Sequence, residues 1–188
     1  MILPVFLYGH PVLKKVAEPI TKSYPKLDEL IANMYETMHN ADGVGLAAPQ
    51  VGLPIRLFVA DGSGFKDPKV KDFKQVFINP TILEESGEEW IFNEGCLSIP
   101  KIREDVSRQF SLVIEYRDEN FVKKKEKFDG TAARIIQHEY DHIEGVLFIE
   151  KISPLRKILI KSKLNDILKA QVEVDFPHRF YVPRKGKK

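Results

Sequence analysis

Residues 138–142 of this chain read HEYDH, a pattern that has a chemical meaning only if the segment is helical. A helix is expected here, from about 131 to 144, because Gly145 is typical of a helix C-terminus. The two histidines lie four residues apart, so a helix projects both imidazoles from one face, where they can bind one metal ion. Glu139 can reach a water on that ion without being a ligand, as a general base for hydrolysis must. The alternative is a solvated helix that carries two unrelated histidines.

A catalytic metal ion usually has three protein ligands, so the two histidines need a further donor. Metzincins supply a third histidine after the motif, but Phe148 occupies that position. Thermolysin-like enzymes supply a downstream glutamate, for which Glu150 and Glu173 are candidates. Cys96 is the only cysteine, which excludes an intrachain disulfide and leaves metal binding, nucleophilic catalysis or core packing as its roles. The residues alone leave this choice open.

The rest of the chain predicts strands in the middle and helices at both ends. Apolar spacing predicts a helix over about 25–41 and another over about 154–171, and polar residues 61–75 predict a loop. The expected strands are 55–60, 76–83, 88–92, 110–116 and 121–128, the last being an edge strand rich in lysine. We therefore expect an α+β fold, with antiparallel or mixed sheets around a central metal-binding helix and with an N-terminal and a C-terminal helix.

Length and composition indicate one globular domain. The chain has 188 residues, of which 43% are hydrophobic, and we expect a single catalytic domain over 1–171 followed by a basic tail over 172–188. A net charge of +2 is too small to indicate nucleic-acid binding by itself. No run approaches the roughly 18 apolar residues of a membrane span, and we recognise no targeting segment. The single cysteine suits a reducing compartment, so we expect a cytoplasmic monomer without a membrane partner.

Three segments together resemble the signatures of the peptide deformylase family, in that family's order and approximate spacing. They are GVGLAAPQ at 43–50, EGCLS at 94–98 and HEYDH at 138–142. The likeness covers about residues 1–155, is looser in the 61–75 loop, and has no family equivalent after about 171. It implies a bacterial hydrolase that removes the N-formyl group from the N-terminal formylmethionine of newly made polypeptides and releases formate.

The resemblance also implies a metal site. Cys96, His138 and His142 would hold the ion, with water in the fourth position, and Glu139 would be the general base. The ligand types alone suggest zinc. The resemblance instead implies Fe²⁺ as the physiological ion, with Zn²⁺, Ni²⁺ or Co²⁺ as substitutes.

Further residues match family positions around the substrate. The Gln50 side-chain amide and the Leu97 backbone N–H would point at the oxyanion that forms from the formyl carbonyl. The substrate-binding residues that the likeness implies are Val44, Gly45, Gly95, Arg103 and Ile135. Among these, Val44 and Ile135 would line the pocket for the methionine side chain, or would be ordinary core. Asp141 would orient a neighbouring group or pair with Arg134 or Arg103.

Other classes of function compete with this interpretation. A zinc endopeptidase would need another histidine or glutamate ligand and would leave Cys96 without a role. A non-catalytic metal-binding or ribosome-binding module would need neither Glu139 nor Gln50. A cysteine-nucleophile enzyme with a histidine base would stay active after metal chelation.

The C-terminal region adds a possible partner beside the nascent formylated polypeptide. Ile160, Leu164, Ile167 and Leu168 predict one apolar helical face, and a second stripe begins with Leu155, Ile158 and Leu159. The basic residues around them and in the tail are Arg156, Lys157, Lys161, Lys163, Lys169, Arg179, Arg184, Lys185, Lys187 and Lys188. Such a surface would bind an RNA-rich particle such as the ribosome. The alternative is a solvated lysine face with a disordered end.

Overall fold

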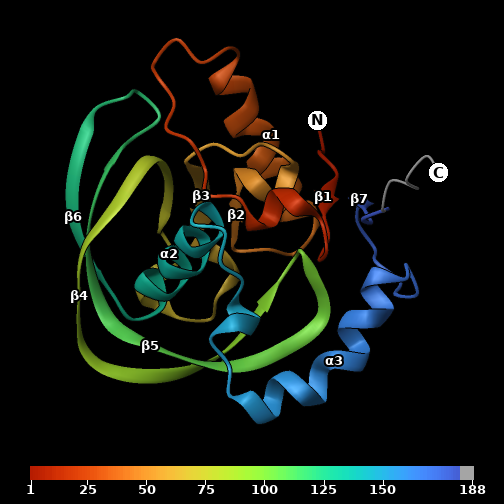
Figure 1. Cartoon of the computed structure of the whole chain (residues 1–188). Helices are drawn as coiled ribbons and strands as arrows, with labels where there is room; N and C mark the ends of the chain where they lie inside the picture. Colours follow the sequence, from red (N-terminus) through yellow and green to blue (C-terminus); the bar gives the residue numbers. More distant parts are fainter. Residues whose placement is uncertain (183–188) are drawn as a thin grey trace.

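A curled sheet around one helix forms the centre of the molecule. The computed structural model describes residues 1–182. Its larger sheet pairs five strands, all antiparallel, in the order β2-β3-β4-β5-β6. Their bounds are β2 Gly45–Ala47, β3 Leu57–Asp61, β4 Lys74–Cys96, β5 Ile99–Arg117 and β6 Lys123–Asp129. Figure 1 shows this sheet curving around α2 (Gly130–Ile143), with α1 (Leu27–Asn40) and α3 (Pro154–Leu168) at its periphery. The expected α+β fold around a central helix is confirmed.

The two longest strands, β4 and β5, are longer than the sequence analysis predicted. The prediction divided β4 into separate strands at 76–83 and 88–92, and it expected β5 only over 110–116. β4 instead runs unbroken for 23 residues, and irregularities in its pairing with β5 occur at several points, one of them between Ser86 and Glu89. Gly87 lies at this irregularity with φ of 88°, a conformation that costs glycine least. Each bulge bends the strand and increases its twist, which is how so long a hairpin wraps the helix.

The helices lie close to their expected positions. α1 begins at Leu27 and buries Ile31, Met34 and Met38 along one face. α3 begins after Ser153, whose hydroxyl accepts a hydrogen bond from the Arg156 N–H at 3.3 Å. Short 3-10 helices fill several connections, namely Pro11–Lys14, Ala48–Val51, Gly62–Gly64, Pro68–Val70 and Phe148–Glu150. Two of these lie in the loop expected at 61–75.

Packing against the sheet orients α2. Its residues Ala133, Ile136 and Ile143 are buried in one cluster with Phe58 and Phe77 of the sheet, whose rings stack at 4.6 Å. These positions recur at helical spacing, so the buried face fixes the rotation of the helix about its axis. The lysine-rich strand β6 lies at the edge of the described sheet, as expected.

The chain after α3 returns to the N-terminal segment. β7 (His178–Arg179) pairs in parallel with β1 (Val5–Phe6), and the two labels lie side by side in Figure 1. Apolar residues before and after β7 pack against the buried cluster around Val5, Ile99 and Ile102; they are Val172, Val174, Phe176 and Phe180. Among residues 1–182, no helix combines the length and apolar character needed to cross a membrane.

Candidate active site

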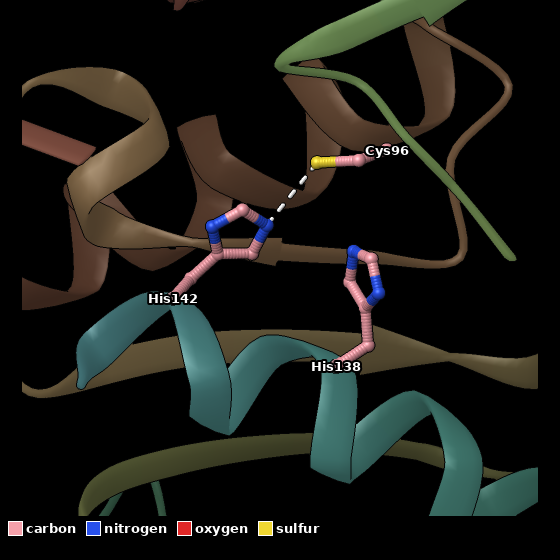
Figure 2. A group of neighbouring side chains, drawn as sticks. All are labelled: Cys96, His138 and His142. Atoms are coloured by element: carbon pink, nitrogen blue, oxygen red, sulfur yellow. Dashed lines mark hydrogen bonds between the residues drawn. The ribbon is translucent and has the colours of Figure 1, made fainter. Parts of the chain in front are cut away.

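Three potential metal ligands from two distant segments meet at α2. His138 and His142 project from successive turns of this helix toward Cys96, which lies at the end of β4 (Figure 2). Their ligand atoms all lie within 4.8 Å of one another, and Cys96 Sγ is 3.2 Å from His142 Nε2. The helix therefore places both imidazoles on one face, as the four-residue spacing predicts.

The donor set fits one transition-metal ion. Metal bonds to cysteine sulfur and histidine nitrogen are about 2.0–2.3 Å long, so three donors this close can share one ion. Burial and the positive charge of His138 lower the pKa of His142 well below its usual value, which keeps its imidazole in the neutral form that binds metals. Hydrogen bonds to Cys96 and Glu94 outweigh the effect of burial and raise the pKa of His138, so metal binding releases a proton there.

A buried carboxylate orients His138. His138 Nδ1 lies 2.9 Å from Glu94 Oε2, so its N–H donates to the carboxylate and Nε2 is left for the metal site. Arg108 donates to both oxygens of Glu94 at 2.7 and 2.9 Å, and Arg134 Nη1 donates to Oε1 at 2.8 Å. Arg108 also donates to Asp141 Oδ2 at 2.6 Å. These charged groups form one network that fixes the ring orientation of His138.

This network decides between the two roles expected for Asp141, in favour of contact with a neighbouring group, and adds residues that the sequence analysis missed. Asp141 pairs with Arg108 and with Lys151, at 2.6 and 3.2 Å, and not with Arg134 or Arg103. Arg103 instead donates to the carbonyl oxygen of Asn93 at 2.6 Å. The strand hairpin is the physical reason, because it brings the side chain of Arg108 between the two carboxylates.

Glu94 and Arg108 had no assigned role in the sequence analysis, and Arg134 was considered only as a partner of Asp141. Glu94 lies two residues before Cys96, and this proximity was the one signal for it. Nothing in the sequence connects Arg108 to either carboxylate, because the contact depends on how β4 pairs with β5.

The two buried carboxylates have opposite acid–base properties. Burial raises the pKa of Glu139 to about 7, and its Oε2 has no hydrogen-bond partner among the described residues. Burial also raises the pKa of Glu94, but hydrogen bonds from His138 and Arg108 outweigh it and hold that pKa well below its usual value. Glu139 is therefore suited to exchange a proton near neutral pH, while Glu94 stays ionised.

Glycine at position 45 lets the backbone of β2 approach Glu139. A Cβ added to Gly45 would lie 2.4 Å from Glu139 Oε1, closer than non-bonded atoms can come. A Cβ on Gly95 would likewise lie 2.7 Å from Arg103 Nη1. Gly45 thus depends on the absence of a side chain, whereas the exposed Arg103 side chain could move away from a Cβ at position 95.

Gln50 directs its amide toward the metal site. Its Oε1 accepts a hydrogen bond from the Ala47 N–H at 2.8 Å, so its Nε2 faces Ser98 Oγ at 3.3 Å and Cys96 Sγ at 3.5 Å. Leu97 follows Cys96 in the turn between β4 and β5. The segment of Gln50 and the segment of Leu97 therefore meet beside the three potential ligands.

A cavity of about 550 Å³ joins these groups. The residues that the family resemblance placed at the site and that line this cavity are Val44, Gly45, Gln50, Gly95, Cys96, Leu97, Arg103, Ile135, His138 and Glu139. His142 is 1% exposed and does not line the cavity. Phe65, Phe92 and residues 173–176 also line the cavity, although the sequence analysis gave the aromatic residues no role. Glu173, considered there as a metal ligand, is not part of the group formed by Cys96, His138 and His142.

Comparison with known proteins identifies this arrangement. A family model described as polypeptide deformylase matches residues 2–158. The chain belongs to the polypeptide deformylase family. Peptide deformylases of Christiangramia forsetii and Flavobacterium johnsoniae are each 57% identical to it over 196 aligned positions, which cover 100% of both chains.

Solved deformylase structures have the same fold. A peptide deformylase from Legionella pneumophila is 34% identical, with a TM-score of 0.80 over 91% of this chain and 98% of the other. One from Thermotoga maritima is 41% identical, with a TM-score of 0.75 over 82% and 99%. The expected activity of a metal-dependent hydrolase that deformylates new polypeptides is thereby confirmed. A zinc endopeptidase finds no support among these relatives.

Proposed function

We propose that Glu139 is the general base and acid of deformylation, acting in the cavity beside Cys96, His138 and His142. The observation that carries this assignment is the position of a buried carboxylate, with an unpartnered oxygen, next to three clustered metal ligands. A divalent ion bound by these ligands would acidify a water molecule and polarise the formyl carbonyl. Glu139 takes a proton from the attacking water and then donates it to the amine nitrogen as the C–N bond breaks. The products are formate and a free amino terminus.

Gln50 and Leu97 supply hydrogen bonds to the oxygen of the formyl group as negative charge develops on it. The Gln50 amide is held by its bond to the Ala47 N–H, so its donor needs no reorganisation during the reaction. Removing one such donor in other enzymes slows catalysis by about 10²–10³-fold. We expect Gln50→Leu to fall within that range.

The substrate-binding residues act through shape and backbone contact. Val44 and Ile135 line the cavity and form the apolar pocket for the methionine side chain. Gly45, Gly95 and Arg103 contact the substrate backbone or its approach, and the two glycines keep that approach open. The described residues supply every proposed group from one chain, which supports action as a monomer.

We infer Fe²⁺ as the physiological ion, with Zn²⁺, Ni²⁺ or Co²⁺ as substitutes, and a cytoplasmic site of action on nascent polypeptides. The inference rests on the family and on a mixed ligand set of one thiolate and two imidazoles, which accepts all four ions. The test is metal analysis of protein purified without oxygen, together with formate release after reconstitution with each ion. Higher turnover with Zn²⁺ than with Fe²⁺ would contradict the inference.

Glu139→Ala tests the central assignment. Metal analysis should show wild-type occupancy, because the three ligands remain, while formate release from formyl-Met-Ala falls about 10²–10⁴-fold. His138→Ala is the matched control, and it should lose the metal as well as the activity. Retention of more than a tenth of the wild-type turnover by Glu139→Ala would show that another group is the base.

We also propose that α3 docks the enzyme on the ribosome. Three residues of the first apolar face that the sequence predicted are directed inward: Ile160 and Ile167 are buried, and Leu164 packs against the same core. The fourth, Leu168, is 40% exposed. The second stripe remains at the surface, where Leu155, Ile158 and Leu159 are exposed by 64%, 69% and 57%. This apolar stripe supports docking, because monomeric proteins seldom expose contiguous large apolar side chains without a function.

Part of the basic surface of α3 is already engaged within the protein. Arg156 pairs with Glu104 at 2.6 Å, and Lys157 donates to the carbonyl oxygen of Glu150 at 2.7 Å. Lys161 and Lys163 are exposed and border the apolar stripe. Of the tail residues expected to contribute, Arg184, Lys185, Lys187 and Lys188 lie outside the described residues.

Co-sedimentation with ribosomes at low and moderate salt tests the docking surface. Lys161→Glu/Lys163→Glu should sediment less than wild type, because lysines that contact phosphate account for salt-dependent binding. Lys125→Glu/Lys127→Glu on β6 makes the same change of charge on another exposed face and should behave as wild type. Equal sedimentation of both variants would contradict docking through α3.

A further inference from the structure

The end of the chain reaches the active-site cavity. Residues 173–176 line the cavity together with residues 100–103 of the β4–β5 hairpin. Figure 1 shows the chain leaving α3 at the right and returning toward β1. These residues lie beyond 2–158, the part of the chain that the family model matches. They are therefore a feature of this chain that the family match does not describe.

Two sets of contacts hold this segment in place. Backbone hydrogen bonds join it to the N-terminal strand, from Val5 N–H to the Pro177 carbonyl at 2.9 Å and from Leu7 N–H to the Arg179 carbonyl at 3.0 Å. Val174 and Phe176 pack against the apolar cluster that also contains hairpin residues Ile99 and Ile102. The segment is thus anchored on the core and can serve as a fixed wall of the cavity.

The side chains of the wall alternate in character. Val172, Val174 and Phe176 are half-buried, whereas Glu173 and Asp175 between them are exposed. This alternation is that of an extended chain with one face on the core. Neither carboxylate forms an ion pair within residues 1–182, so both leave negative charge at the cavity.

We propose that residues 173–176 are part of the substrate-binding site and that the carboxylates of Glu173 and Asp175 favour substrates with lysine or arginine after the formylmethionine. The proposal rests on the function above, which places the formyl group beside Cys96 and Glu139 at the inner end of the cavity. The residues that follow formylmethionine must then leave along its walls, where carboxylates attract cationic side chains.

Basic residues of the same cavity oppose the attraction of cationic peptides by Glu173 and Asp175. Lys101 is exposed on the hairpin, and Arg103 is held by hydrogen bonds to Asn93 at 2.6 and 3.0 Å. These cations repel a basic peptide, whereas the carboxylates of the wall attract it. The preference of the wild type between basic and acidic peptides is therefore the net result of the two effects. The contribution of the wall is therefore measured as the change in kcat/KM when its carboxylates are neutralised.

The test compares wild type with Glu173→Gln/Asp175→Asn, which keeps side-chain shape and removes two negative charges. The substrates are formyl-Met-Ala-Lys-Lys, formyl-Met-Ala-Glu-Glu and formyl-Met-Ala, at about 20 and 300 mM salt. We expect kcat/KM for the lysine peptide to fall about two- to tenfold at low salt, mainly through KM. The loss should shrink at high salt, because salt screens exposed charges. The glutamate peptide should not lose rate, and formyl-Met-Ala, which has no charged side chain, should lose less of its kcat/KM than the lysine peptide does.

Glu84→Gln/Glu88→Gln is the matched control. It removes the same two charges from exposed positions of β4 that do not line the cavity, so it reports any effect of net charge alone. An unchanged ratio of kcat/KM between the lysine and glutamate peptides, relative to this control, would overturn the proposal while leaving deformylation intact. Failure of the wild type to release formate from formyl-Met-Ala would overturn the proposed function, and this inference with it.

Discussion

Replacing Glu94 by glutamine would test two roles of this buried carboxylate, one in the stability of the fold and one in metal affinity. Glu94 is 4% exposed and receives hydrogen bonds from His138, Arg108 and Arg134. The side chains of Arg108 and Arg134 are only 4% and 2% exposed. After the substitution Arg108 keeps its pair with Asp141, whereas Arg134 loses the carboxylate with which it pairs. Removing one partner of a buried ion pair costs about 3–5 kcal/mol. For a domain of this size, that corresponds to a fall in Tm of about 6–20 °C.

Metal affinity should fall in the same variant. Glutamine can still contact His138 Nδ1, but it provides no negative charge to hold the imidazole in its ligating orientation. Loss of such a partner typically weakens metal binding about 10–100-fold. Calorimetric unfolding of the metal-free protein measures the first effect, and competition with a chelator measures the second.

A second buried carboxylate provides the comparison. Glu104 is also 4% exposed, but its partner Arg156 is 51% exposed and stays hydrated after the substitution. Glu104→Gln should therefore lose less stability than Glu94→Gln and should bind metal as wild type does. If the two variants lost equal stability, or if Glu94→Gln bound metal within threefold of wild type, the argument from this network would be refuted.

Three further changes test the site. Cys96→Ser should lose both metal and formate release, because a serine hydroxyl is far less acidic than a thiol; metal analysis decides. Gly45→Ala should lower the free energy of unfolding by about 1–3 kcal/mol and also the turnover, because its Cβ meets Glu139; urea unfolding and formate release measure both. Glu139 must be ionised to accept a proton, so kcat/KM should fall as pH falls through its pKa. Burial raises that pKa to about 7 and a bound cation lowers it, so a midpoint above pH 7.5 would contradict the assignment.

The sequence by itself determined those features that depend only on residues close together along the chain. The spacing of His138 and His142 places both rings on one face of any α-helix, because a helix turns once in about 3.6 residues. The helix boundaries, the edge strand β6 and the family resemblance likewise rest on local patterns. They were sufficient to predict an α+β fold and a deformylase.

Contacts between distant segments were decided only by the tertiary structure. Arg108 meets Glu94 and Asp141 because β4 pairs with β5 in one register, and a register shift by one residue would turn Arg108 to the opposite face. The bulges that keep β4 continuous, through which the hairpin wraps α2, also depend on that pairing. Packing also decides which stripe of α3 is exposed and whether Glu173 and Asp175 reach the cavity, because both depend on which apolar residues pack against the core. A pattern of apolar side chains indicates that a face will be buried, but it does not indicate which segment will cover that face. Only the packing of the whole chain settles these contacts.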